Sequence, residues 1–348
     1  MHALVVQQPG GPEALRLRRL ADPRPGPGQV VVAVEAVGVN PVDAGNRADP
    51  SWAGVVPPYV VGYELAGRIE AVGEGASWKR GDPVWGLLPV RGTRWGTYAE
   101  LVALDAALVG PRPPDLSAVQ AAALPLAGAT AVQLLDRLAP RPGEWVLVHG
   151  AAGGVGSLFV QLARVRGARV VASASAQWEA LVRELGAEVF LDRHAGQVAE
   201  RACRAISQEL DMVADLVGSG TLAASLPMVR EGGRAGSIVE LAGDLEPAVD
   251  RNITLHGVLV RPSRAVLGVL AAAVADGSLR PVVDQVLDLA DAALAHRRVE
   301  SRCGQGKVVL QVARQRTAER AAYGTGVQEL ARGNRPACCG QRAEPGRS

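Results

Sequence analysis

The sequence predicts an α/β protein in which a compact β-barrel-like domain is followed by a doubly wound parallel sheet. Three observations support this. The first third consists of short apolar runs separated by Gly and Pro, strand-like and helix-like segments then alternate, and a glycine-rich loop joins a buried strand to a helix. The length of 348 residues suits two domains, at roughly 150 residues each.

The N-terminal part is predicted to form closely spaced strands, because Gly and Pro interrupt its apolar runs. Such spacing is typical of a small barrel. The predicted strands are Ala3–Val6, Gln29–Val37, Glu64–Val72, Pro83–Leu88 and Thr97–Val102.

The middle of the chain begins with a predicted helix over Ala118–Leu138, and strands then alternate with helix-length segments. This alternation is typical of a parallel sheet covered on both faces. The predicted strands are Trp145–His149, Arg169–Ala172, Val189–Leu191, Met212–Val217, Gly236–Val239 and Leu255–Val260. An apolar helix from about Pro262, a strand over Val283–Leu287, a helix around Asp291–Arg298 and a strand over Lys307–Val312 follow.

Composition favours a small-molecule partner. The net charge of +2 provides no overall field for nucleic acid or an anionic membrane, and no apolar run reaches the length of about 20 residues that spans a bilayer. Four cysteines without paired spacing predict reduced thiols and a cytoplasmic protein. Residues 314–348 are rich in Arg, Gly and Gln, and we expect a disordered tail, with an interaction arm as the alternative.

The strongest functional signal is a glycine loop that follows the strand Trp145–His149 and opens a helix. Glycine lets the backbone turn tightly and approach a pyrophosphate, whose charge is stabilised at the helix N-terminus. The context of a strand before the loop and a helix after it predicts dinucleotide binding. The predicted contacts are Gly150, Ala152, Gly153, Gly154, Val155 and Gly156.

The end of the next strand indicates which dinucleotide binds. An acidic residue there would hold the ribose diol of NAD, but the stretch Ala172–Gln177 contains no acid. Ser173, Ser175 and Arg193 are suited to a 2′-phosphate instead. The sequence therefore predicts NADPH as the cofactor.

Four segments together resemble the medium-chain dehydrogenase/reductase superfamily: Gly62–Gly67, Val72–Val84, the glycine loop and Gly306–Val312. Val37–Asp43 and His149–Gly156 are similar to its zinc-independent quinone oxidoreductase (zeta-crystallin-like) branch. The resemblance implies a GroES-like catalytic domain from residues 1–118, a Rossmann NADP-binding domain over 119–260, and a return segment, 261–313, that completes the catalytic domain. It also implies a homodimer paired through an edge strand near Leu255–Val260.

The resemblance also indicates that zinc is absent. Zinc-dependent relatives carry a Cys near Val39–Asp43 and a His inside the Gly-x-Glu motif, and these places hold Asn40 to Asp43 and Tyr63 here. Residues 1–202 contain no cysteine, whereas zinc sites need several Cys, His or acidic ligands.

Without a Lewis acid, the expected task is hydride transfer to a quinone or an α,β-unsaturated carbonyl. Tyr63 is the first candidate hydrogen-bond donor to the acceptor oxygen, with a packing role as the alternative. Asn40 and Asp43 match the family's polar pair near the nicotinamide and ribose, although Asn-Pro and Asp also occur in ordinary turns.

Further contacts follow from the resemblance. Thr130 corresponds to a cofactor-contacting residue, or else bonds its own helix backbone. Strand ends at the carboxyl edge of a parallel sheet bind ligands, and these ends predict cofactor contacts at Val217, Val239, Glu240, Val258, Leu259 and Val260. The predicted substrate pocket contains Tyr59, Trp52, Trp95 and Arg261.

Two other functions are considered. The stretch from Ala172 resembles the cofactor strand of polyketide enoyl reductases, which suggests an enoyl reductase of secondary metabolism. Trp178 stands where many relatives carry Lys, so its effect on NADPH preference is open. A protein that binds NADPH with little turnover has the same glycine loop, and only a turnover assay separates it from an enzyme.

Overall fold

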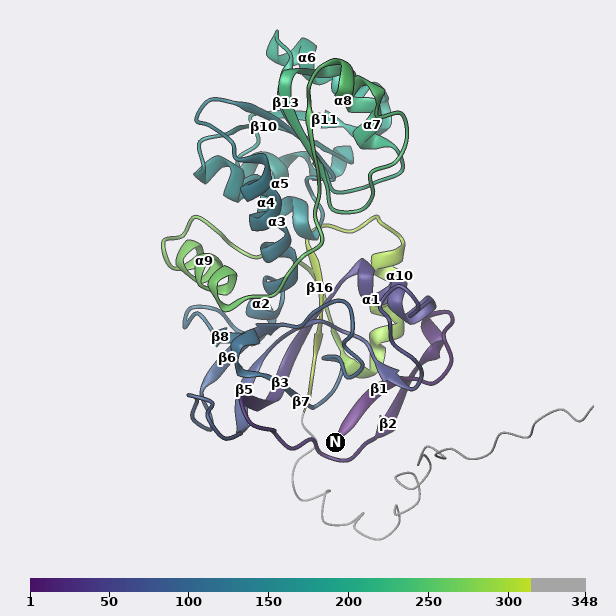
Figure 1. Cartoon of the computed structure of the whole chain (residues 1–348), viewed down its shortest axis with the longest axis vertical. Helices are drawn as coiled ribbons and strands as arrows, with labels where there is room; N and C mark the ends of the chain where they lie inside the picture. Colours follow the sequence, from purple (N-terminus) through teal and green to yellow (C-terminus); the bar gives the residue numbers. More distant parts are fainter. Residues whose placement is uncertain (314–348) are drawn as a thin grey trace, which may run out of the picture. The chain divides into compact units, whose positions relative to one another are not determined.

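The computed structural model describes residues 1–313, and it confirms the predicted α/β class. The strands form a six-stranded sheet, a seven-stranded sheet and a small three-stranded sheet. Figure 1 shows the six-stranded sheet and its helices in the upper half, with the other strands below. The predicted disordered tail lies outside the described residues.

The six-stranded sheet is parallel throughout and has the order β11-β10-β9-β12-β13-β14. From β9 the chain adds β10 and β11 on one side and then β12, β13 and β14 on the other side. The strand order therefore reverses between β9 and β12, and dinucleotides bind in the crevice at such a reversal. The strands are β9 (Trp145–His149), β10 (Arg169–Ala174), β11 (Val189–Asp192), β12 (Leu210–Asp215), β13 (Val229–Ser237) and β14 (Thr254–Gly257).

Both faces of this sheet are buried, because alternate residues of each strand contribute to different apolar clusters. In β9, Val146 and Val148 pack with α3 and α4, whereas Leu147 packs with α6 and α7. The helices of this half are α3 (Pro125–Leu138), α4 (Gly154–Val165), α5 (Glu179–Glu184), α6 (Val198–Ile206), α7 (Thr221–Ser225) and α8 (Glu246–Asp250).

The seven-stranded sheet has the order β15-β16-β3-β5-β6-β8, and β7 also pairs with β3. Its strands are β3 (Gln29–Val39), β5 (Glu64–Val72), β6 (Pro83–Leu87), β7 (Leu101–Asp105), β8 (Val109–Pro111), β15 (Val283–Asp288) and β16 (Lys307–Gln311). The three-stranded sheet contains β1 (His2–Val6), β2 (Leu15–Arg19) and β4 (Tyr59–Val60). The helices nearby are α1 (Pro41–Ala48), α2 (Ala118–Ala122), α9 (Arg264–Ala275) and α10 (Ala292–Glu300).

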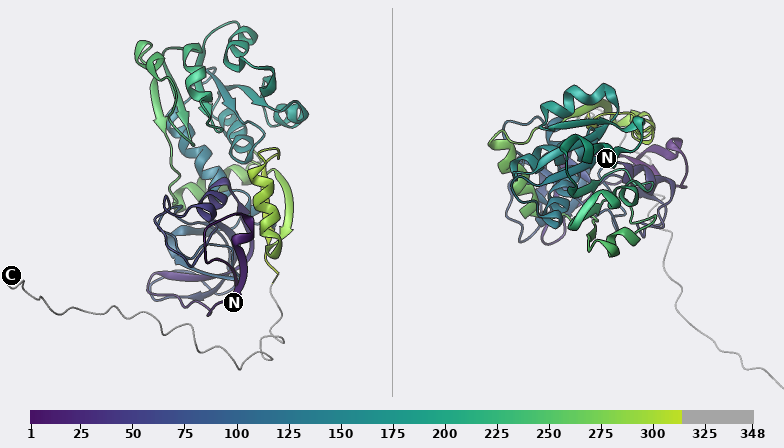
Figure 2. Two further views of the ribbon diagram at one scale, coloured as in Figure 1. Left: turned by 90° about the vertical axis from the view of Figure 1, so that its right-hand side faces the viewer. Right: turned by 90° about the horizontal axis from the view of Figure 1, so that it is seen from above.

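The return segment joins the N-terminal strands. β16 pairs antiparallel with β3 and parallel with β15, so strands from the two ends of the described chain share one sheet. Figure 2 shows α10 and its neighbouring strand beside the N-terminal strands. The internal domain boundaries near residues 118 and 260 stay predictions, since residues 1–313 form a single compact unit.

Several predicted boundaries differ from the structure. The strand expected at Gly236–Val239 is wrong in extent: it is β13, which ends at Ser237 and begins at Val229. Three glycines inside it lower the β-propensity of the sequence. The helix predicted over Ala118–Leu138 is two helices, because Pro125 begins α3 and cannot continue α2. The strand predicted over Thr97–Val102 starts later, at Leu101.

Helix α1 was not expected, since Gly45 and Asn46 disrupt its apolar pattern. It begins with a capping box, in which the Asp43 side chain accepts a hydrogen bond from the Asn40 backbone N–H at 2.7 Å. Within residues 1–313, no helix has the length and apolar character needed to cross a bilayer.

We expect that Leu310→Ala will strongly destabilise the protein. Leu310 is fully buried in β16 between β3 and β15, and removing such a side chain costs about 2–5 kcal/mol of unfolding free energy. Val286→Ala in the adjacent β15 is the control, because Val286 is largely exposed. Urea unfolding of both variants measures the difference, and equal losses would contradict the packing described.

Candidate active site

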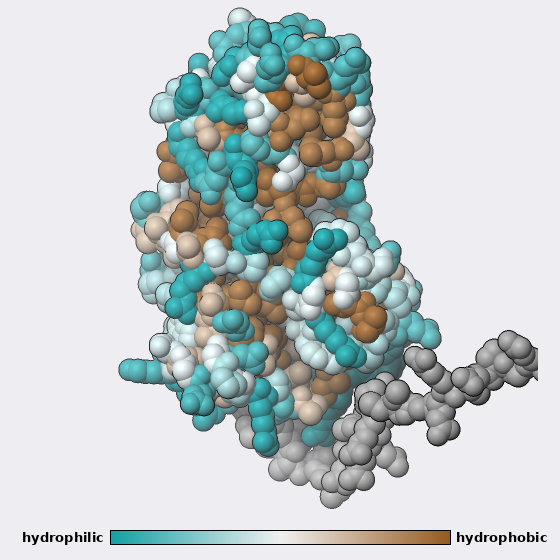
Figure 3. Space-filling model, in the orientation of Figure 1, coloured by the Kyte–Doolittle hydropathy of each residue, from teal (hydrophilic) through white to brown (hydrophobic). Residues whose placement is uncertain are grey.

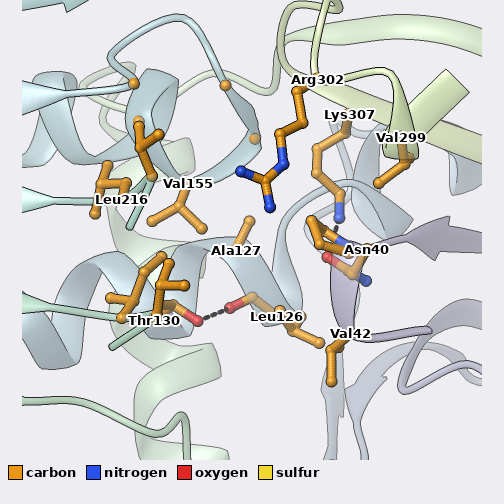
Figure 4. Close-up of a pocket in the computed structure, with 18 of the residues that line it drawn as sticks. Asn40, Val42, Leu126, Ala127, Thr130, Val155, Leu216, Val299, Arg302 and Lys307 are labelled. Carbon is orange, nitrogen blue, oxygen red and sulfur yellow. Dashed lines mark hydrogen bonds between the residues drawn. The ribbon is translucent and has the colours of Figure 1, made fainter. Parts of the chain in front are cut away.

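A cavity of about 1020 Å³ lies between the carboxyl ends of the parallel strands, helix α1 and the return segment. Its wall contains residues from sequence positions as distant as Val39 and Val308. Figure 4 shows Arg302 and Lys307 projecting into this cavity from the return segment, opposite Thr130 and Leu216. The cavity therefore depends on both halves of the described chain.

The glycine loop forms one end of the cavity. Gly150 has a φ of +77°, which favours glycine, and a Cβ on Gly156 would overlap the carbonyl oxygen of Gly150. The loop is anchored to β10 because Gly150 N–H and Ala151 N–H both donate to the Ser173 carbonyl at 3.0 Å. The local sequence thus fixes a tight turn at the start of α4.

This turn is suited to an anion. Gly153 is the N-cap of α4 and has no side chain to cap it. The first N–H groups of a helix have no intrahelical acceptor, so they are suited to bind an anion. Gly306 N–H donates to the Ala152 carbonyl at 2.8 Å, which holds the return segment against the loop. The loop residues predicted from the sequence line the cavity: Gly150, Ala152, Gly153, Gly154, Val155 and Gly156.

The end of β10 is polar and carries no carboxylate in the cavity wall. Ser175 and Arg193 line it, with His194 between them: Ser175 Oγ is 3.5 Å and Arg193 Nε 3.0 Å from His194 Nε2. Trp178 also lines this end. A hydroxyl and an exposed guanidinium are suited to a 2′-phosphate. Ser173 needs correction, because it is buried in β10 and does not line the cavity.

The remaining strand ends also contribute as expected. The predicted residues that line the cavity here are Val217, Val239, Glu240, Val258, Leu259 and Val260. Glu240 accepts a hydrogen bond from Ser219 N–H at 2.5 Å, which closes the loop after β12. Thr130 lines the cavity and also donates to the Leu126 carbonyl at 2.8 Å, so its contact with a ligand and its backbone hydrogen bond are compatible.

A buried polar cluster lies around Asn40, where the return segment meets the start of α1. Lys307 Nζ donates to Glu64 Oε1 at 2.8 Å and also to Asn40 Oδ1, and Asn40 Nδ2 donates to Glu64 Oε1 at 2.8 Å. Asn40 and Lys307 line the cavity, whereas Glu64 lies behind them. The cluster thus brings polar atoms to the cavity wall.

Asp43 lies behind this wall and not in it, which corrects its expected place beside the cofactor. The carboxyl accepts from Asn40 N–H and from Tyr98 OH at 3.2 Å, and its other oxygen has no partner among residues 1–313. Complete burial raises the pKa of Asp43 to about 7. Tyr98 OH is also 3.2 Å from His296 Nε2, and burial lowers the pKa of His296 to about 3, so this imidazole is neutral.

The predicted aromatic residues separate into two groups. Trp52 lines the cavity, with the Arg91 guanidinium 4.6 Å above its ring. Tyr63 and Tyr59 are buried and do not line it: Tyr63 OH accepts from Asn46 Nδ2 at 2.6 Å, and Tyr59 OH donates to the Asn46 carbonyl at 2.8 Å.

Trp95 and Arg261 also lie outside the cavity lining. Trp95 is exposed under the Arg94 guanidinium, and the backbone of Arg261 is paired with the Gln133 side chain. Of the four predicted substrate-pocket residues, the structure therefore brings only Trp52 to the cavity. The hydroxyl of Tyr63 is not placed to donate to a ligand there, because Asn46 and the surrounding core enclose it.

Sequence reasoning missed two cations in the return segment. Lys307 and Arg302 both line the cavity, and Arg302 has a φ of +52°. A signal for Lys307 was present, because three apolar residues follow it in its strand. A lysine that is buried with such a strand needs an opposite charge, which Glu64 supplies. The exposed loop that carries Arg302 offered no comparable signal.

The side chains do not fit a metal. Within residues 1–313, no three His, Cys, Asp or Glu side chains are grouped so that they could hold an ion. Asn40 and the buried Tyr63 occupy the region where the resemblance places zinc ligands in other members. The carboxylates that line this cavity, Asp49, Glu240 and Asp284, come from separate segments and belong to no such group among the described residues.

Two protein families match the chain. Residues 26–114 match the alcohol dehydrogenase GroES-like domain, and residues 185–310 match the family described as zinc-binding dehydrogenase. The second description names a metal that the described residues do not fit.

Individual proteins match over most of the chain. The quinone oxidoreductase of Rattus norvegicus is 33% identical, covering 89% of this chain and 97% of that protein. The chloroplastic NADPH-dependent alkenal/one oxidoreductase of Arabidopsis thaliana is 33% identical, covering 89% and 79%. A mycobacterial protein solved in complex with NADPH is 31% identical, with a TM-score of 0.79 and coverage of 89% and 99%.

We expect that Gly156→Ala will weaken dinucleotide binding by roughly tenfold or more, the equivalent of 1.4 kcal/mol. The added Cβ overlaps the Gly150 carbonyl and must open the turn. Gly268→Ala is the matched control, because a Cβ at this position in α9 meets open space. Fluorescence titration with NADPH measures both affinities, and unchanged binding by Gly156→Ala would show that the loop does not cradle the cofactor.

Asp43 should make stability depend on pH. Its folded pKa of about 7 lies above the ordinary value of 3.8, so the folded state keeps a proton that the unfolded state loses. Stability therefore falls as pH rises between these values. Asp43→Asn removes the ionisation, so its stability relative to the wild type should increase from about pH 5 to about pH 8.

Urea unfolding across this pH range tests the expectation. The exposed Asp250→Asn is the control for the loss of one carboxylate. If Asp43→Asn retained the pH dependence of the wild type, another group would be responsible for it.

Proposed function

Because this chain belongs to the medium-chain dehydrogenase/reductase superfamily, as a zinc-independent member related to quinone oxidoreductases, we propose that it is an NADPH-dependent reductase of quinones or of α,β-unsaturated carbonyl compounds. The observation that carries the proposal is the cavity itself. It combines a glycine loop for a pyrophosphate with a β10 end that offers Ser175 and Arg193 and no carboxylate.

The described residues are suited to hold NADPH. The N–H groups at the start of α4 would bind the pyrophosphate, and Ser175 and Arg193 the 2′-phosphate. Bound NADPH supplies a hydride from its nicotinamide C4. Arg302, in the return segment, adds a positive charge to the wall of the same cavity. This set supports NADPH over NADH.

At the other end, the protein must stabilise the negative charge that develops on the acceptor oxygen. We propose the carboxamide nitrogen of Asn40 as the hydrogen-bond donor, in place of Tyr63. Asn40 lines the cavity, while the Tyr63 hydroxyl does not. Val42, Trp52 and Val90 provide apolar and aromatic surface at this end, which favours a flat acceptor.

A homodimer and a cytoplasmic location are part of the proposal. β14 is the last strand of its sheet, and Val249, in the helix that precedes it, is an exposed apolar side chain outside the cavity lining. Figure 3 shows apolar surface gathered over the upper part of the face in view. Sedimentation at two protein concentrations tests the dimer, and fractionation of the source cells tests the location.

The decisive experiment follows NADPH absorbance with a simple quinone and with a 2-enone, after treatment of the protein with a chelator. We expect turnover with NADPH at least roughly tenfold faster than with NADH, because a charge-assisted contact is worth about 1.5–3 kcal/mol. The chelator should leave the rate unchanged.

Other outcomes separate the alternatives. Binding of NADPH without reduction of either acceptor would favour a binding protein or an enoyl reductase with a specialised substrate. Loss of activity on chelation would contradict the proposed metal-free chemistry.

A further inference from the structure

Lys307 and Glu64 form a buried ion pair, in which Lys307 belongs to the cavity wall and Glu64 lies behind it. Lys307 is 4% exposed and Glu64 is 0% exposed, and their charged atoms are 2.8 Å apart. The ammonium group donates to three acceptors: Glu64 Oε1, the Val39 carbonyl at 3.0 Å and Asn40 Oδ1. An ammonium group has three N–H donors, so Lys307 has none left for a ligand.

Both carboxylate oxygens of Glu64 also accept hydrogen bonds from the protein. Its Oε1 accepts from Lys307 and Asn40, and its Oε2 accepts from Leu126 N–H at 2.7 Å, in the first turn of α3. Strand β3 leaves room for this carboxylate at Gly38, where a Cβ would overlap Glu64 Oε1. The pair therefore holds a fixed geometry between β16, β5 and α3.

The ion pair determines how the side chain of Asn40 is oriented. Its oxygen faces the Lys307 ammonium and its nitrogen faces the Glu64 carboxylate. A flipped carboxamide would turn its N–H groups toward the ammonium and its oxygen toward the carboxylate, and both contacts would be repulsive. The ion pair therefore selects one orientation of the carboxamide.

This orientation leaves one donor available. The Asn40 nitrogen carries two N–H groups, and within residues 1–313 the acceptor shown for this nitrogen is Glu64 Oε1, which uses one of them. Asn40 lines the cavity, and Figure 4 shows the hydrogen bond that joins it to Lys307.

We propose that Lys307 and Glu64 are positioning residues, which fix the Asn40 carboxamide so that its remaining N–H is presented to the carbonyl oxygen of the acceptor. This inference rests on the proposed reductase function. A buried ion pair often stabilises a protein no more than apolar residues of the same size would. Stability alone therefore does not account for this pair, whereas the orientation of Asn40 does.

The test uses the full chain with the double substitution Lys307→Met and Glu64→Gln. Met keeps the aliphatic stem that packs against Gly154, and Gln keeps an acceptor for Leu126 N–H. No charge is left unpaired, while the orientation of Asn40 is no longer imposed. We expect kcat with a saturating quinone to fall about tenfold to a hundredfold, since one donor to an oxyanion is worth about a hundredfold to a thousandfold.

The positioning role predicts that the Kd for NADPH stays within about threefold of the wild type, because the glycine loop is unchanged in sequence and the Met stem still packs against Gly154. A purely structural role predicts instead that NADPH binding and kcat are lost together. The control is the double substitution Arg112→Met and Glu35→Gln, which removes an ion pair of 2.6 Å from the same part of the protein but away from the cavity. It should leave kcat unchanged, even where the midpoint of thermal unfolding falls.

A double-mutant cycle shows whether the ion pair acts through Asn40. It compares the Lys307→Met and Glu64→Gln substitutions in the wild type and in the Asn40→Ala variant. If it does, the double substitution will lower kcat little further in the Asn40→Ala background, because the group that it positions is already gone. Independent, multiplicative effects would overturn the inference, as would an unchanged kcat in the double variant. If that variant does not fold, Lys307→Arg carries the test, because it leaves no charge unpaired while the larger, planar guanidinium cannot keep the same contacts with Asn40 and Val39; it should still lower kcat several-fold.

The two proposals fail in different ways. A wild-type protein that reduces neither a quinone nor a 2-enone overturns the proposed function, and the positioning role falls with it. A wild-type protein that reduces the quinone at the same rate as the double variant overturns only the positioning role.

Discussion

The ion pair between Lys307 and Glu64 is the interaction on which the arrangement of the site depends. It joins the strand that returns from the end of the described chain to β5, to the turn before α1 and to the first turn of α3. Burying either charge without the other would cost on the order of 3–5 kcal/mol of folding free energy. The correct placement of β16 therefore requires β5, and that of β5 requires β16. One wall of the cavity is fixed in this way, and the glycine loop fixes the opposite wall through short-range geometry.

The features that sequence predicted well are those whose cause is local. The glycine loop follows from the conformational needs of Gly150 and Gly156 and from the strand and helix on either side. β5 and β9 have the predicted bounds, and in β9 four consecutive apolar residues precede His149. The absence of an acidic residue after β10 is a property of a short stretch of sequence and needs no distant contact. The structure has Ser175 and Arg193 in the cavity wall.

The features that sequence did not reveal depend on contacts between distant segments. Asp43 and Tyr63 occupy motif positions that resemble catalytic places, yet the packing of Tyr98, Asn46 and the strands around them encloses both side chains. Lys307 looked like the first residue of an apolar strand, and only its partner on β5, 243 residues away, explains its charge. β13 was misplaced because its glycines remove the local signal, while its pairing with β12 and β14 supplies the order.

The pairing of β16 with β3 also bears on how the protein is made. During synthesis, the N-terminal strands leave the ribosome long before their neighbour in the seven-stranded sheet exists, since Val39 pairs with Val308. Until then β7 covers this edge of β3 only over residues 29–33, and residues 36–39 have no partner strand on this edge among the described residues. Unpaired strand edges favour association with other chains. The parallel sheet, whose strands all lie between residues 145 and 257, can form without this delay. Completion of the cavity is thus a late event, and a nascent chain has a nucleotide-binding half before it has a site that can act on a substrate.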